Sequence, residues 1–140
     1  MAKIAGALGE DIGSLRRQGP DSGTIEAASE RMLREGEASW RDILLEFVDD
    51  FRARPSPEAV AAAPRPGLSA RLRALLAAAT ESLCAESRLD APWWCEGAPP
   101  LAEPWFPADT ESLKAIALLE SPVCFRRRNI FVFANFLARA

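Results

Sequence analysis

The chain has 140 residues, enough for one domain and little more, and its 49% hydrophobic and 26% charged residues are typical of a soluble domain. It contains no His and no Tyr, which excludes Ser-His-Asp and Cys-His catalysis, zinc sites built on His, and a tyrosine acid or base. The formal net charge of −3 argues against a broad basic field for nucleic acid.

Residues 1–20 carry a weak helical pattern. Ile4, Leu8, Ile12 and Leu15 recur at helical spacing, but glycines are interspersed and each weakens a helix by about 1 kcal/mol relative to Ala. We expect a marginal helix or a mobile arm. The glycines lack the Lys-Ser/Thr pair of a phosphate loop. The segment does not resemble a signal peptide, and no apolar run in the chain is long enough to span a membrane, so we expect a cytoplasmic protein without membrane contact.

Residues 22–53 show the clearest helical pattern. Large apolar residues follow i, i+3, i+4 spacing and Gly36 falls on the same stripe, so either one long helix runs through it or two helices meet there. Ser22 or Thr24 is in position to cap the start. Most of the many carboxylates lie off the stripe and form either a solvated face or an acidic surface for a basic protein partner. The candidate partner-binding acids are Asp42, Glu46, Asp49 and Asp50.

The next two segments are a linker and a second helix. Residues 54–67 are rich in proline, which predicts a linker with a single helical turn at residues 57–63. Residues 68–88 are dominated by leucine and alanine at helical spacing, with Ser69 as a candidate cap. Such a stripe is typical of a core helix and not of a cofactor site.

Residues 90–108 hold five of the eleven prolines and three of the four tryptophans. Proline disfavours both a helix and an inner strand, so the segment is expected to be a long loop that buried tryptophan rings pin onto the helices. Trp93 and Trp94 are neighbours, and an extended backbone would point their rings in opposite directions, leaving one partly exposed. The loop is either a packed structural segment or an aromatic anchor for a protein partner, with Trp93 and Trp94 as the candidate contacts.

Further short secondary-structure elements are predicted in the C-terminal part of the chain. Residues 109–120 are expected to form a helix with one apolar face and a cap at Asp109 or Thr110. A short helix from Val123 to Arg128 follows. The apolar run Ile130–Phe133 is a strand, a buried turn or the start of a helix.

Arg126, Arg127 and Arg128 form the most prominent run of like charge. Consecutive residues on a helix are about 100° apart, so the three guanidinium groups are not expected to share one face or one phosphate. The arginines either complement the C-terminal end of a helix, pair with the acidic residues of 22–53, or contact a protein partner. Nucleic-acid binding is the least favoured of these interpretations.

No cofactor or metal site is expected. Cys84, Cys95 and Cys124 are 11 and 29 residues apart, too widely spaced for a structural zinc site, and their odd number does not suggest a disulfide framework. We expect free, mostly buried thiols, which no His is available to activate. Carboxylates adjacent in sequence diverge on a helix, so no acid–base dyad is predicted either.

Four motifs stand out in residues 68–140. They are Arg71-Leu72-Arg73-Ala74-Leu75-Leu76, Ala91-Pro92-Trp93-Trp94, Glu103-Pro104-Trp105-Phe106-Pro107, and Ser121-Pro122 followed by Phe125-Arg126-Arg127-Arg128-Asn129-Ile130-Phe131-Val132. Together they resemble a segment of small uncharacterised bacterial proteins of the antitoxin or regulator kind. The resemblance implies a helical protein, sometimes attached to a helix-turn-helix, with a toxin or nucleotidyltransferase-like partner. It supplies no catalytic residue, and residues 1–67 show no clear helix-turn-helix.

The sequence therefore predicts an all-α protein. Residues 21–140 are expected to form a single helical domain, a compact bundle of about five or six helices with the Trp/Pro-rich loop packed across it. The leading functional hypothesis is a non-enzymatic protein-binding module, antitoxin-like or regulatory, and self-association is left open. The alternatives are a DNA-binding regulator and a small enzyme with a carboxylate- or thiol-based site.

Overall fold

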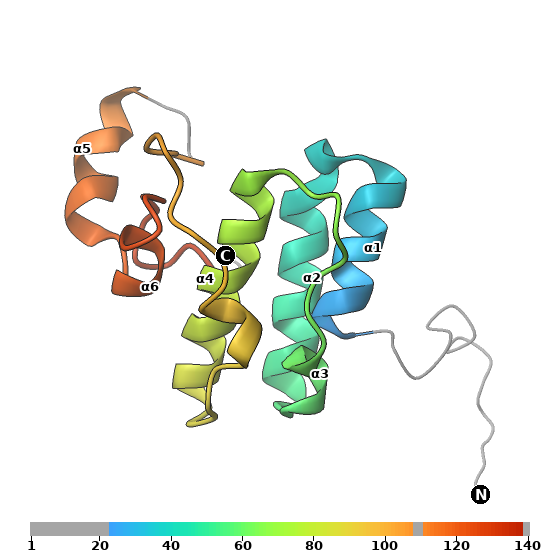
Figure 1. Ribbon diagram of the computed structural model, residues 1–140. Helices are drawn as coiled ribbons and strands as arrows, with labels where there is room; N and C mark the ends of the chain where they lie inside the picture. Colours follow the sequence, from blue (N-terminus) through green and yellow to red (C-terminus); the bar gives the residue numbers. More distant parts are fainter. Residues whose placement is uncertain (1–22, 108–110, 139–140) are drawn as a thin grey trace, which may run out of the picture.

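In the computed structural model, which describes residues 23–107 and 111–138, the chain folds into six α-helices and two 3-10 turns, without any strand (Figure 1). The predicted all-α class is therefore confirmed, whereas the expectation for residues 1–20 lies outside the described residues. None of the described helices is both long enough and apolar enough to cross a membrane. The elements are α1 (Ile25–Glu35), η2 (Glu37–Ser39), α2 (Trp40–Ala53), α3 (Glu58–Ala61), α4 (Ala70–Glu86), η3 (Trp93–Cys95), α5 (Glu111–Glu120) and α6 (Val123–Arg126).

The chain breaks between α1 and α2 at Gly36. Thr24 Oγ1 accepts the backbone N–H of Ala27 at 3.0 Å and so caps the start of α1. Gly36 adopts a φ of +103° and a ψ of 142°, a conformation that is costly for any residue with a Cβ. The chain leaves the helix there and re-enters one at Trp40. Residues 22–53 thus contain two helices, not one.

Replacing Gly36 by Ala is expected to lower the free energy of unfolding by about 1–3 kcal/mol, because a Cβ strains this backbone conformation. No neighbouring atom lies within 4 Å of the added Cβ, so the cost comes from the backbone alone. Gly97 is the matched control, since its φ is not positive and its added Cβ would make an ordinary contact of 3.6 Å with Trp94 O. Gly97→Ala should change stability by at most about 1 kcal/mol. Equal losses for both variants in urea unfolding would refute the strain assigned to Gly36.

α4 is the central helix of the core. Ser69 Oγ caps it by accepting the backbone N–H of Leu72 at 3.3 Å, as predicted. Residues 74–79 are all buried, and the alanines among them allow α2, α6 and η3 to pack closely against the helix. The linker at residues 54–67 contains the predicted single turn as α3. α4 therefore connects the α1–α2 pair with the C-terminal elements (Figure 1).

The Trp/Pro-rich loop packs across these helices, as predicted. Phe131 N–H donates to Trp105 O at 2.9 Å, and Trp105 and Ile130 form an isolated parallel bridge. The run Ile130–Phe133 is therefore not the start of a helix but a non-helical segment that pairs with the loop. The ring of Trp105 meets that of Trp40 edge to face with 5.6 Å between centroids, which ties the loop to the start of α2.

Candidate functional site

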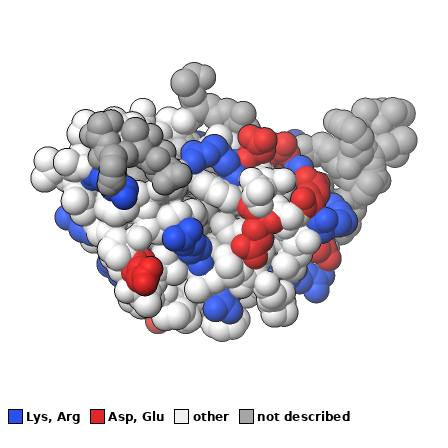
Figure 2. Space-filling model, turned by 90° about the horizontal axis from the view of Figure 1, so that it is seen from above, with Lys and Arg blue, Asp and Glu red and all other residues white. Residues whose placement is uncertain are grey.

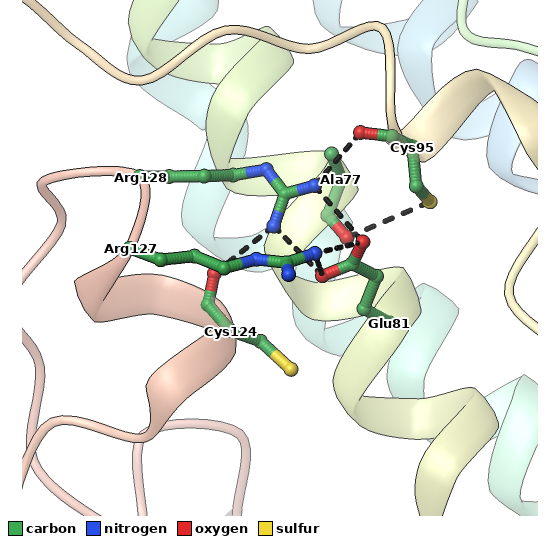
Figure 3. A network of polar contacts seen from close by, with 6 residues as sticks. All are labelled: Ala77, Glu81, Cys95, Cys124, Arg127 and Arg128. Atoms are coloured by element: carbon green, nitrogen blue, oxygen red, sulfur yellow. Dashed lines mark hydrogen bonds and ion pairs between the residues drawn. The ribbon is translucent and has the colours of Figure 1, made fainter.

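Glu81 of α4 is the centre of an ion network in which Glu81 and Arg128 are buried and Arg127 is exposed (Figure 3). Arg128 Nη1 and Nη2 donate to its two carboxylate oxygens at 2.7 and 3.0 Å, and Arg127 Nη2 donates to both oxygens at 2.7 and 2.6 Å. Arg128 also donates to the backbone oxygens of Cys95 at 2.7 Å and Cys124 at 3.1 Å. One carboxylate and two guanidinium groups thereby join α4, η3 and α6.

The two arginines converge on one carboxylate although they are adjacent in sequence. Helix α6 ends at Arg126, and the chain then turns through Asn129, whose φ is +67°. The predicted helix extended to Arg128. The three guanidinium groups do not share one face, as expected, but two of them, Arg127 and Arg128, meet at one carboxylate. Arg126 donates separately from Nη2 to Ser121 O at 2.7 Å. Among the described residues, none of the three arginines forms an ion pair with an acid of α1 or α2.

The network keeps Glu81 ionised. Burial raises the pKa of its carboxyl, but the hydrogen bond and charge of Arg128, together with those of Arg127, lower it more, so the pKa lies below the ordinary value of 4.5. Four donated hydrogen bonds occupy the two oxygens, which leaves the carboxylate little capacity to accept a substrate proton. The arrangement suits a structural cross-link better than a general base.

An open hollow of about 380 Å³ lies beside this network. Its walls are Glu81, Arg127 and Arg128 on one side and residues from 91 to 100, including Glu96, on the other. Two arginines and two glutamates line it, so their formal charges cancel. The hollow has no excess charge that would select an ionic ligand.

The thiols are poor candidates for catalysis. Cys84 and Cys95 are buried and Cys124 is half-buried, and all three are free. Burial is the main cause that raises the pKa of each thiol, that of Cys95 to about 12. Protonated thiols are weak nucleophiles at neutral pH. In the part of the chain that the structure describes, no group of three Cys, Asp or Glu side chains is placed to hold a metal ion.

Trp93 and Trp94 have opposite environments, so one ring is exposed as expected. The backbone there is the 3-10 turn η3, however, and not the extended chain on which that expectation rests. Trp94 is only 7% exposed, and its Nε1 donates to the backbone oxygen of Val60 at 2.8 Å. Trp93 is 78% exposed. Of the two candidate contacts, Trp94 therefore holds the loop on the core, and Trp93 remains available to a partner.

The four candidate acids lie on α2, with Asp42, Glu46 and Asp49 exposed and Asp50 half-buried. Glu46 Oε1 accepts from Arg31 Nη1 at 2.7 Å, which links α2 to α1. Asp49 and Asp50 also interact with other parts of the chain. The structure does not bring these acids together with the three arginines, whose carboxylate partner is Glu81.

An apolar surface covers the outer side of α5 and the start of α6. Ala117 is buried, and Ser121 Oγ donates to the backbone oxygen of Ile130 at 3.0 Å, so this side of α5 faces the core. Leu119 is 83% exposed and Val123 is 68% exposed, and two further aliphatic side chains of α5 are also exposed. The α5–α6 surface is defined by Ile116, Leu118, Leu119 and Val123.

Sequence reasoning missed this surface. Residues 109–120 are expected to bury one apolar face, but residues 115–119 are apolar in unbroken succession, which is more than one face of a helix can bury. The sequence thus indicates an exposed apolar surface, because apolar residues lie on all sides of this short helix. The caps expected at Asp109 or Thr110 lie outside the described residues.

Comparison with known proteins gives no relative: no family model, curated protein or solved structure matches this chain. The surfaces and contacts of the chain itself are therefore the basis for any function assigned to it.

Proposed function

We propose that the chain is a non-enzymatic protein-binding module and that the α5–α6 surface is its docking surface. The observation that carries this proposal is the exposure of four aliphatic side chains within eight residues of the chain. Single exposed leucines are ordinary on protein surfaces. A cluster of this kind is typical of an interaction site, because a partner removes its apolar area from water.

The polar residues considered for nucleic-acid binding or catalysis also support this proposal, because contacts within the chain already occupy them. Arg127 and Arg128 bind Glu81, so two of the three guanidinium groups in the run considered for nucleic-acid phosphates are engaged within the fold. The saturated Glu81 and the protonated thiols offer no activated group for catalysis. Trp93, exposed on η3, is a second apolar anchor that a partner could cover. An antitoxin-like role, with a toxin or nucleotidyltransferase-like partner, is the specific form of this proposal that the family resemblance suggests.

Affinity capture of the tagged chain from cells of its native host tests the proposal. The wild-type chain is expected to retain a protein in stoichiometric amount. Leu119→Glu places a charge at the most exposed point of the α5–α6 surface and should abolish that retention, because an unpaired charge is costly to bury in an interface.

Leu33→Glu is the matched control, since Leu33 is also an exposed leucine but lies on α1. It should retain the same protein as the wild type. Thermal unfolding of both variants checks that the fold is intact. The proposal fails if the wild type retains no stoichiometric partner, or if Leu119→Glu retains the same partner as the wild type.

A further inference from the structure

We infer that the protein seated on the α5–α6 surface is a second copy of this chain, an inference that rests on the proposed function. The four side chains that define the surface are uncharged, so two copies can meet there without burying an unpaired charge. In a two-fold dimer each copy offers the same residues to the other, and the patch must therefore complement itself. An uncharged aliphatic patch meets this condition, and homodimer interfaces are more apolar than other interfaces.

The charges beside this surface are of opposite sign. Glu120 ends α5 and Arg126 ends α6, three residues after Val123 and hence on the same side of that helix. Among the described residues, the Glu120 side chain accepts only the backbone N–H of Ala134, at 3.1 Å, and the Arg126 side chain donates only to Ser121 O. Neither side chain forms an ion pair within the described residues. In a two-fold dimer, Glu120 of one copy can pair with Arg126 of the other.

The acid-rich part of the molecule lies away from this surface. Acidic side chains gather over α1 and α2, whereas α5 forms the opposite edge of the molecule (Figures 1 and 2). Pairing through α5 keeps the acid-rich helices of two copies on the outside of the dimer, where salt screens their repulsion beyond about 8–10 Å. A strongly basic partner would be attracted to α1 and α2 instead.

Sedimentation equilibrium of the purified full chain tests the inference. The average mass is expected to rise with protein concentration from 15.2 kDa towards twice that value. Leu119→Glu should weaken the dimer by at least about tenfold, because Leu119 is the most exposed side chain of the surface. Leu33→Glu, on α1, should dimerise like the wild type.

A charge exchange tests the two-fold arrangement itself. Arg126→Glu and Glu120→Arg each place like charges at both ends of the interface, and with two exposed pairs lost each should weaken the dimer by up to about thirtyfold. In an equimolar mixture of the two variants, a mixed dimer regains both opposite-charge pairs. Mixing is therefore expected to restore association close to that of the wild type, with circular dichroism as the check that each variant is folded.

Three sedimentation results would overturn the inference: a wild-type mass of one chain at every concentration, a Leu119→Glu variant that dimerises like the wild type, or a Leu33→Glu variant that fails to dimerise. In the charge exchange, a mixture of the two variants that associates no better than either variant alone would also overturn it. If the purified chain stays monomeric while Leu119→Glu still abolishes capture from cells, the partner is a different protein. In that case the second copy is ruled out and the proposed protein-binding function stands.

Discussion

Glu81→Gln is expected to lower the free energy of unfolding by about 3–5 kcal/mol, because it leaves Arg128 charged and buried without its counter-ion. Arg128 is almost fully buried and cannot turn to water, whereas the more exposed Arg127 can. The loss should therefore come mainly from Arg128. Urea unfolding followed by circular dichroism measures it.

Glu86→Gln is the matched control on the same helix. Glu86 also binds an arginine, accepting from Arg52 at 2.8 and 3.1 Å, but both side chains are well exposed. An exposed pair of this kind contributes about 0–1 kcal/mol. If Glu81→Gln costs no more than Glu86→Gln, the buried network does not hold the fold together as described.

The stability of the wild type should also depend on pH through Glu81. Because the pKa of Glu81 is lower in the folded chain than its ordinary value of 4.5, the unfolded chain binds more protons between the two values. The contribution of Glu81 is therefore complete above about pH 4.5 and is lost as the pH falls through the lower, folded pKa. Glu81→Gln removes this titration, so its stability should fall less than that of the wild type on acidification.

Trp94→Ala should have an effect of similar size, about 3–5 kcal/mol. The substitution removes a buried indole ring and leaves the Val60 carbonyl without the hydrogen bond that Nε1 donates at 2.8 Å. It should also loosen the Trp/Pro-rich loop, which hydrogen–deuterium exchange of residues 91–107 can detect.

Trp93→Ala is the control next in sequence. Its ring is largely exposed, so the free energy of unfolding should change by no more than about 0.5 kcal/mol. Equal losses for the two tryptophan variants would contradict the opposite environments described for them.

Local patterns predict much of this fold. The apolar periodicity places α1, α2 and α4, and the caps Thr24 and Ser69 lie where short polar side chains precede an apolar run. Gly36 marks a break, but the pattern alone leaves open one helix or two, because only its backbone conformation decides between them. The exposure of one of the two neighbouring tryptophans is also predicted, although the extended backbone assumed for it is a 3-10 turn in the structure.

The contacts at the candidate sites depend on tertiary structure, which local patterns do not encode. Glu81 lies 46 residues before Arg127, and nothing in either segment specifies that they meet. Arg127 and Arg128 both reach this carboxylate although they are adjacent in sequence, and the helical spacing within their own segment does not predict it. Similarly, the apolar residues of α5 show that one side must remain uncovered, but only packing decides that Leu119 is on that side.

Thiol labelling at position 119 tests most directly whether the α5–α6 surface binds a protein. Leu119→Cys and, as a reference, Leu33→Cys are treated with a maleimide in intact cells and as dilute purified protein, with the signal of the native cysteines subtracted. We predict that Leu119→Cys reacts more slowly in cells than in dilute solution, whereas Leu33→Cys shows no such difference once corrected for reagent entry. A Leu119→Cys variant that reacts as fast in cells as in dilute solution, after the same correction, would contradict the assignment of the α5–α6 surface as a docking site.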